Sequence, residues 1–204
     1  MTTLAPRDWN QRYETGQLPW DTGEPDGNLL ETLKQLALKD AKALEIGCGT
    51  GTNAIALARH GFSHVTATDL SPKAIEMAVA KAKTAGATSI DFKVHDIIAS
   101  LPEKPASVGF VFDRGVFHSV SDEQRATFAR HVAQTLTTHG WWLSLCGNAD
   151  DKTEGGPPRL TAAHIASVVE PLFEVHAITR SQFRKVKERT SDHFMCWRVL
   201  LRKR

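Results

Sequence analysis

The chain has 204 residues, of which 41% are hydrophobic and 24% charged, and its formal net charge is +2 at pH 7. This length and composition suffice for one domain with a full core, and the small net charge gives no reason to expect a nucleic-acid partner. No apolar run is long enough to cross a membrane, the polar N-terminus is no signal peptide, and three irregularly spaced cysteines suit neither a disulfide framework nor a zinc site. We therefore expect a cytoplasmic protein with no membrane partner and no metal.

Residues 1–28 form a polar segment that contains Gly, Pro and two tryptophans, Trp9 and Trp20. Such a segment has little core of its own in which to bury large aromatic side chains, so we expect it to fold over something. One interpretation is a lid in which Trp20, and Trp9 with it, closes over a bound molecule. The alternative is that both tryptophans anchor the segment to the core by ordinary burial.

Between residues 29 and 145 the apolar residues switch repeatedly between helical and strand spacing. Helices are predicted at 29–38, 52–60, 72–85 and 122–138, and strands at 43–46, 65–69, 90–94, 108–113 and 141–145. Cap residues support these boundaries: Ser71-Pro72 opens one helix, Gly61 follows another, and Gly140 is expected to terminate the last. The alternation indicates an α/β fold with a Rossmann-like, doubly wound, mostly parallel sheet.

The sequence after residue 145 is less regular. Residues 148–159 are expected to be a loop, because they contain two Gly and two Pro residues in succession. A helix is predicted at 161–169, strands at 173–178 and 194–201, and an exposed charged connection at 180–192. The two strands are expected to form an antiparallel hairpin at the sheet edge, which completes a seven-stranded sheet in a single domain.

The most informative stretch is the glycine turn from Gly47 to Gly51, followed by an isolated acid, Asp69, at the end of the next predicted strand. A strand, a glycine turn, a helix and a second strand that ends in an acid form the layout of a βαβ nucleotide site. Thr52 stands where the dinucleotide fingerprint has its third glycine, and no lysine follows the turn as in a phosphate-binding loop. The pattern therefore indicates a nucleoside without a diphosphate, such as S-adenosylmethionine. The alternative is only a tight strand-to-helix turn.

The run Glu45-Ile46-Gly47-Cys48-Gly49-Thr50-Gly51 resembles the first motif of the class I S-adenosylmethionine-dependent methyltransferases, and later landmarks up to about residue 145 follow in the family's order. Asp69 matches the acid that holds the ribose hydroxyls in that family. Residues 92–97 resemble the motif whose Asp accepts from the adenine amino group, and residues 110–115 resemble the strand whose end faces the sulfonium. The resemblance implies a cofactor site that comprises Trp9, Trp20, Glu45, Gly47, Gly49, Gly51, Asp69, Leu70, Asp96, Ile97 and Asp113.

The N-terminal segment narrows the resemblance. Trp9, Tyr13, Gly16, Pro19-Trp20-Asp21 and Gly23 are similar to the lid of the thiopurine and thiol methyltransferase group, which includes plant halide/thiol enzymes and bacterial tellurite-resistance methyltransferases. This similarity implies that residues 1–28 are a lid and that residues 29–204 form the methyltransferase domain.

Four further residues are candidates for catalysis or acceptor binding, in addition to Trp20 as an acceptor contact. Asp113 is either a proton acceptor or, as the resemblance favours, a polar ligand near the methionine moiety or a structural carboxylate. Arg114 either orients an anionic substrate or pairs with a carboxylate. His118 is either a polar contact or weak base, or an ordinary loop histidine, and Arg159 either anchors the substrate or is a solvated loop residue.

Methyl transfer from a sulfonium mainly requires a nucleophile held in line with the methyl carbon in a dry site. A thiol with a pKa near 8.5 is partly ionised at neutral pH and needs no strong general base, which suits a sequence with no obvious one. We therefore expect transfer to a small soft nucleophile, above all a thiol sulfur, with S-adenosylhomocysteine as product, by a monomer or weak dimer. The alternatives are a small-molecule O- or N-methyltransferase, a non-catalytic S-adenosylmethionine-binding module and an NAD-linked oxidoreductase.

Overall fold

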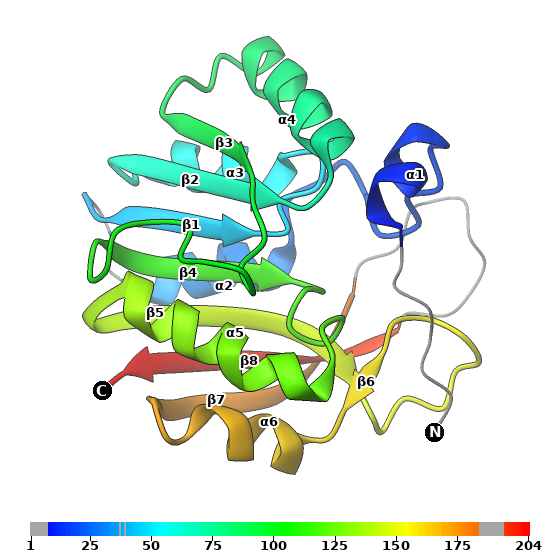
Figure 1. Cartoon of the computed structure of the whole chain (residues 1–204), viewed down its shortest axis with the longest axis vertical. Helices are drawn as coiled ribbons and strands as arrows, with labels where there is room; N and C mark the ends of the chain where they lie inside the picture. Colours follow the sequence, from blue (N-terminus) through cyan, green and yellow to red (C-terminus); the bar gives the residue numbers. More distant parts are fainter. Residues whose placement is uncertain (1–7, 37, 39, 184–193) are drawn as a thin grey trace.

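The computed structural model describes residues 8–36, 38, 40–183 and 194–204. A single sheet in the order β3-β2-β1-β4-β5-β8-β7 forms its centre, and the short β6 pairs with β5 outside this path (Figure 1). The strands are β1 (Lys42–Ile46), β2 (His64–Asp69), β3 (Ile90–Val94), β4 (Val108–Arg114), β5 (Leu136–Asn148), β6 (Arg159–Leu160), β7 (Phe173–Gln182) and β8 (Met195–Lys203). The helices are α1 (Trp9–Glu14), α2 (Gly27–Gln35), α3 (Thr52–His60), α4 (Pro72–Thr84), α5 (Asp122–Thr135) and α6 (Ala162–Val169). β1 to β5 are parallel and β8 is antiparallel to β5 and β7, which confirms the predicted α/β sheet with its antiparallel edge.

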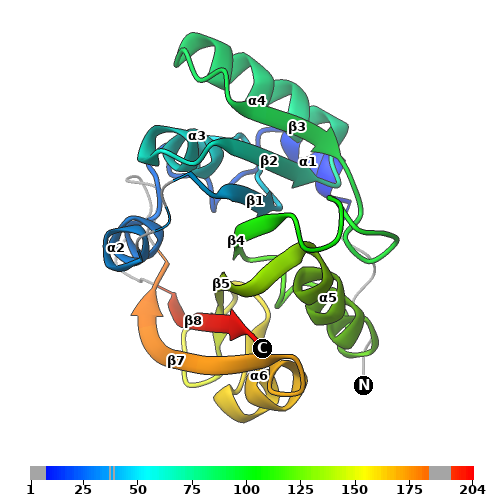
Figure 2. The same cartoon turned by 90° about the vertical axis from the view of Figure 1, so that its left-hand side faces the viewer.

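Both faces of the sheet are covered because successive side chains of the central strands enter two different hydrophobic clusters. Val111 of β4 belongs to the cluster that contains Phe128 of α5. Its neighbour Phe110 belongs to the cluster that contains Leu57 of α3. Figure 2 shows the result, with α5 and α6 on one side of the sheet and α2 and α3 on the other. This is the two-sided burial that parallel sheets require.

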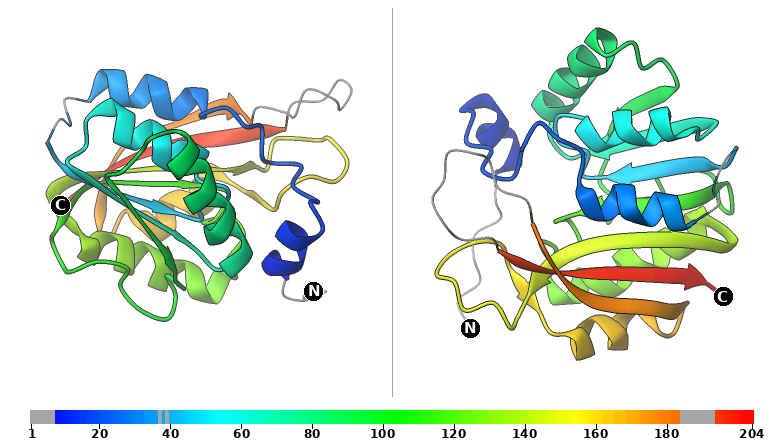
Figure 3. Two further views of the ribbon diagram at one scale, coloured as in Figure 1. Left: turned by 90° about the horizontal axis from the view of Figure 1, so that it is seen from above. Right: turned by 180° about the vertical axis from the view of Figure 1, so that it is seen from behind.

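The parallel strands bring their carboxyl ends to one edge of the sheet. In the observed register Ile46 of β1 lies between Thr68 of β2 and Asp113 of β4, so the segments that follow these strands meet. α1 lies beyond this edge in Figure 1, and the rear view in Figure 3 shows α2 and α3 covering the back of the sheet. In sheets of this kind ligands bind at the carboxyl edge.

The N-terminal segment contains a helix that the sequence analysis did not predict. Asp8 caps α1, because its side chain accepts the N–H of Gln11 at 3.0 Å. Asp26 caps α2 in the same way through the N–H of Asn28 at 2.9 Å. α2 therefore begins at Gly27, close to the predicted division of the chain at residue 28, and that division stays a prediction.

The boundary between α5 and β5 differs from the prediction. α5 ends at Thr135 rather than at residue 138, and β5 begins at Leu136 rather than at residue 141, so Gly140 lies inside the strand. Leu136 is fully buried and pairs with Val108 of β4. This buried pair and the β-branched threonines that follow favour extended chain over a further helical turn.

Two other boundaries differ in smaller ways. β7 continues to Gln182 rather than ending at residue 178, because it stays paired with β8 along this length. The described part of the predicted charged connection is thus mostly strand, and residues 184–192 of that connection lie outside the described residues. α2 ends at Gln35 rather than at residue 38. None of the helices in the described ranges is both long and apolar enough to cross a bilayer.

Candidate functional site

The glycine turn leaves β1 and closes over the N-terminus of α3. Gly47 and Gly49 have φ angles of 69° and 54°, in the left-handed region that residues with a Cβ rarely adopt. A Cβ on Gly47 would lie 2.2 Å from Val116 Cγ2, and one on Gly49 would lie 2.9 Å from the hydroxyl of Tyr13. Glycine is therefore required at both of these positions in the turn. Cys48 between them is buried.

Asp69, at the end of β2, holds the turn in place. Its Oδ2 accepts the N–H of Gly49 at 2.9 Å, and its Oδ1 accepts the N–H of Ser71 at 3.0 Å. Burial raises the pKa of this carboxyl, while these backbone hydrogen bonds act in the opposite direction. A carboxylate has about four acceptor positions, so Asp69 can support the turn and still accept from a ribose hydroxyl.

Glu45 lies in β1, just before the turn, and is 1% exposed. Its Oε2 has no hydrogen-bond partner among the described residues. Burial raises the pKa of this carboxyl well above its usual range, and the Asn53 side chain acts against that shift. A buried carboxyl oxygen without a hydrogen-bond partner destabilises the folded state. This atom is therefore suited to accept a hydrogen bond from a ligand or a water at the turn.

Apolar surface adjoins these acids. Leu70, which follows Asp69, is 51% exposed, an unusual position for a large aliphatic side chain. Asp96 follows β3, and its Oδ1 accepts the N–H of Ile98 at 2.8 Å, whereas Ile97 is buried. A glycine cradle, a buried carboxylate pair and an exposed leucine together fit an adenosine group that carries an amino acid. The residues present therefore fit S-adenosylmethionine.

α1 and the segment after it lie over the glycine turn. Tyr13 is buried, with its hydroxyl against Gly49, and burial and the negative charge of Asp69 raise its pKa. The Trp20 ring meets Tyr13 at 6.2 Å and Trp9 at 5.6 Å, in both cases edge to face. These contacts bring Trp9 and Trp20 together above the predicted cofactor site, and their contact with a cofactor stays a prediction.

Asn10 fastens α1 to the segment that follows Asp69. Its Oδ1 accepts from the Ser71 hydroxyl at 2.7 Å and from the N–H of Lys73 at 3.0 Å. The start of α4 therefore contacts both Asp69 of the predicted cofactor site and Asn10 of α1. That residues 1–28 form a lid stays a prediction, and these contacts hold only the described helix α1 against the start of α4.

Arg114 connects the end of β4 to the same segment. Its Nε–H donates to Asp26 Oδ2 at 2.8 Å and its Nη1–H to the Trp20 carbonyl at 3.2 Å. The guanidinium carbon also lies 5.0 Å from the centre of the Phe183 ring. The arginine side chain is 13% exposed and that of Asp26 3%, so this is a buried ion pair, in which loss of either partner is costly. The geometry supports the salt-bridge interpretation of Arg114, and its contact with an acceptor stays a prediction.

Asp113 is fully enclosed below the segment that follows β4. Its Oδ1 accepts the N–H of Phe117 at 3.0 Å and its Oδ2 accepts the Trp142 Nε1–H at 2.9 Å. Burial raises the pKa of this carboxyl to about 6. A carboxylate held in this way shapes the backbone, which supports the structural alternative over proton abstraction.

His118 and Arg159 are also engaged by backbone groups. His118 is buried, and its Nδ1 accepts the N–H of Gly147 at 2.7 Å. Arg159 donates to the carbonyls of Thr153 and Gly155, the latter at 3.0 Å, and so braces its own loop. Catalytic or acceptor-binding roles for both residues stay predictions.

A cavity of about 580 Å³ opens between α2 and the end of β7, at the carboxyl edge of the sheet. Asp26 and Phe183, which both contact Arg114, are part of its lining, as are Asn28, Glu31, Ser181 and Met195. Asp26 and Phe183 are not among the site residues predicted from the sequence. The N-cap position of Asp26 before α2 was a readable signal, whereas nothing local marks Phe183.

In the described ranges, no group of three or more His, Cys, Asp or Glu side chains is placed to hold a metal ion. The described polar and aromatic groups of the site are hydrogen-bonding carboxylates, an aromatic cluster and one buried arginine.

A family model described as thiopurine S-methyltransferase matches residues 4–198. The chain is 27% identical over 176 residues to probable thiol methyltransferase 2 of Arabidopsis thaliana. This match covers 85% of the present chain and 76% of the plant protein. It is 26% identical over 196 residues to thiocyanate methyltransferase 1 of Brassica oleracea, with 92% and 84% covered. An S-adenosylmethionine-dependent methyltransferase from Aquifex aeolicus has the same fold. The two structures superimpose with a TM-score of 0.73 at 16% sequence identity, and the match covers 97% of this chain and 100% of that one.

Proposed function

Because this chain belongs to the thiopurine S-methyltransferase family, we propose that it methylates a small molecule at a soft anionic atom, above all a thiol sulfur. The chain is a S-adenosylmethionine-dependent methyltransferase, with S-adenosylhomocysteine as product. The two plant relatives are named for a thiol and for thiocyanate, which are both soft sulfur nucleophiles. The proposal extends that acceptor chemistry to this chain.

The observation that carries the proposal is that the titratable groups at the end of β4 are already engaged. Asp113 is sealed and accepts two N–H groups through different oxygens, and His118 accepts a backbone N–H through Nδ1. An alcohol or amine acceptor needs a base to take its proton. A thiolate brings its nucleophile already ionised, so it suits a site of this kind.

We assign the chain's own residues the following roles. Asp69 and Glu45 accept from the ribose and amino groups of the cofactor, and Leu70 and Ile97 line the base. Tyr13 and Trp20 exclude water from the reacting atoms, which favours attack of an anion on a cation. Bound S-adenosylmethionine supplies an activated methyl group, so the protein's task is mainly to position the acceptor.

The acceptor is proposed to reach the site through the cavity beside α2. Phe183 lines this cavity and contacts the side chains of both Arg114 and His118. A small acceptor with an apolar body would pack on Phe183 and present its anionic atom to the Arg114 side. The localisation proposed is the cytoplasm, where thiols stay reduced.

The test is incubation of the purified protein with methyl-labelled S-adenosylmethionine and separate acceptors: thiols, sulfide, thiopurines, halides, tellurite and small phenols. Labelled product and S-adenosylhomocysteine are followed together, so that transfer is distinguished from cofactor breakdown. Label on a thiol or another soft anion supports the proposal. Label on a phenol or an amine alone would favour the O- or N-methyltransferase alternative, and cofactor binding without any transfer would favour the non-catalytic module.

A further inference from the structure

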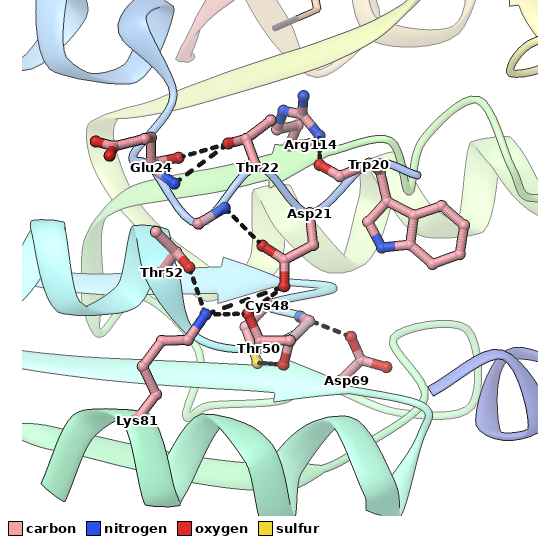
Figure 4. Close-up of polar contacts among 12 residues, drawn as sticks. Trp20, Asp21, Thr22, Glu24, Cys48, Thr50, Thr52, Asp69, Lys81 and Arg114 are labelled. Carbon is pink, nitrogen blue, oxygen red and sulfur yellow. Dashed lines mark hydrogen bonds and ion pairs between the residues drawn. The ribbon is translucent and has the colours of Figure 1, made fainter. Parts of the chain in front are cut away.

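A second polar cluster joins the lid to the glycine turn and to α4, and Figure 4 shows its members. Asp21 Oδ2 accepts from the Thr50 hydroxyl at 2.7 Å. Lys81 of α4 donates to the Thr50 hydroxyl and, at 2.9 Å, to the Thr52 hydroxyl. Its ammonium also lies 4.0 Å from the same oxygen of Asp21. We call Asp21, Thr50, Thr52 and Lys81 the lid anchor.

The hydrogen bonds of the lid anchor run in one direction. Lys81 has only donors, the Thr50 hydroxyl accepts from Lys81 and donates to Asp21, and Asp21 only accepts. Thr50 is buried, whereas the side chains of Lys81 and Asp21 are 36% and 22% exposed. The cation and the anion at the two ends are therefore coupled through a buried hydroxyl and remain accessible to dissolved ions.

The lid anchor acts on the peptide next to Trp20. Asp21 follows Trp20 in the chain, and the Trp20 carbonyl accepts from Arg114 at 3.2 Å. The backbone at Trp20 is thus held from β4 on one side and from α4 on the other. The Trp20 ring meets Tyr13, and the Tyr13 hydroxyl lies against Gly49, so the ring adjoins the glycine turn through Tyr13.

We propose that Lys81 is a positioning residue which, through Thr50 and Asp21, holds Trp20 over the cofactor site and slows cofactor dissociation. This inference rests on the proposed role of Trp20 as a cover for that site. Lys81 does not need to contact the cofactor, because its effect passes through the lid. The sequence offers no local sign of this role, since Lys81 is 31 residues from Thr50 along the chain.

Lys83 provides a matched control. It lies in the same last turn of α4, so its ammonium interacts with the helix dipole in the same way. It is exposed, and its side chain makes no hydrogen bond or ion pair with the described residues. Lys83→Met thus removes the same charge from the same helix end and leaves the lid anchor intact.

The experiment measures binding of S-adenosylhomocysteine by calorimetry and its dissociation by stopped-flow fluorescence. We expect Lys81→Met to weaken binding about three- to tenfold relative to Lys83→Met, mainly through faster dissociation, as befits a partly exposed ion pair. We also expect this difference to shrink when the salt concentration rises from about 0.02 M to about 0.5 M. The Debye length falls from about 10 Å at 0.1 M to about 3 Å at 1 M, so added salt weakens the attraction between exposed charges. Equal dissociation rates for the two variants would overturn the inference.

A double-mutant cycle separates the lid anchor from a general effect on folding. Asp21→Asn should weaken binding as Lys81→Met does, and the double variant should be little worse than either, because both remove the same coupling. Additive effects would contradict the inference, and so would a lower melting temperature of the ligand-free Lys81→Met protein with unchanged dissociation. Because these measurements need no methyl acceptor, a failed acceptor assay leaves their outcome unaffected.

Discussion

The carboxylates at the site accept hydrogen bonds from the protein backbone. Asp69 fixes the glycine turn and the start of α4 with one oxygen each. Asp113 holds the segment after β4 in the same manner, from a fully buried position. At the scale of single residues, these carboxylates therefore determine the shape of the site, and we propose that Asp69 also contributes to its affinity for the cofactor.

Asp69→Ala should weaken binding of S-adenosylhomocysteine by roughly 1.5 to 3 kcal/mol, the usual contribution of a hydrogen bond to a charged group. The ligand-free protein should also lose some stability, because the N–H groups of Gly49 and Ser71 lose their acceptor. Calorimetry and thermal melts measure the two effects. Asp91→Ala, at an exposed carboxylate of β3, is the control, and unchanged affinity in Asp69→Ala would refute the ribose role.

The raised pKa of the Asp113 carboxyl should make the stability of the protein depend on pH. Its pKa is raised from 3.8 to about 6, so the folded state binds the proton more tightly than the unfolded state between these values. The stabilisation due to protonation is therefore lost as pH rises through about 4 to 6. Asp113→Asn lacks this titration, so the stability of the variant relative to wild type should improve by about 2 kcal/mol between pH 4.5 and pH 7.5. Urea unfolding at both pH values measures this, and a constant difference would show that the pKa is not raised.

His118→Ala should lower the melting temperature but leave thiol turnover nearly intact. The variant leaves the Gly147 N–H without its side-chain acceptor, which costs about 1 to 3 kcal/mol of stability. A nucleophile that arrives ionised needs no base, so kcat/KM for thiols should stay within about threefold of wild type. If turnover collapses and recovers at high pH, His118 is the base and the proposed mechanism is wrong.

At the scale of elements, we propose that the predicted lid excludes water from the site. Trp20→Ala removes two edge-to-face ring contacts, each worth about 0.5 to 1.5 kcal/mol, so the ligand-free protein should lose only a modest amount of stability. Methyl transfer should fall by about tenfold or more, and Trp20→Phe should restore part of it. A large loss of melting temperature with little change in rate would instead make Trp20 an anchor of the core.

The sequence was sufficient to predict the elements whose signals are local. The glycine turn, the acid at Asp69 and the alternation of strands and helices each depend on neighbouring residues, and the structure has the sheet that they indicate. The pairing of Arg114 with Asp26 joins residues 88 apart, so no local pattern specified it. The early start of β5 likewise depends on burial of Leu136 beside Val108, a tertiary contact that overrode the expected Gly140 terminator.

At the scale of the whole molecule, the parallel order of β1, β2 and β4 brings three chain segments to one edge, and α1 lies beyond that edge (Figure 1). The cavity beside α2 reaches the same edge from the hairpin side. We propose that the cofactor binds under α1 and that the acceptor approaches through the cavity beside α2. This separation suits a transferase that binds two small molecules side by side.

The central claim is that the transferred methyl group goes to sulfur. The most direct measurement compares thiophenol with phenol, two acceptors of the same shape that differ in one atom, in parallel reactions with methyl-labelled S-adenosylmethionine. We predict labelled product and a matching amount of S-adenosylhomocysteine with thiophenol, at a rate about a hundredfold or more above that with phenol. The reason is that only the thiol is appreciably ionised near neutral pH. Equal or faster transfer to phenol would contradict it.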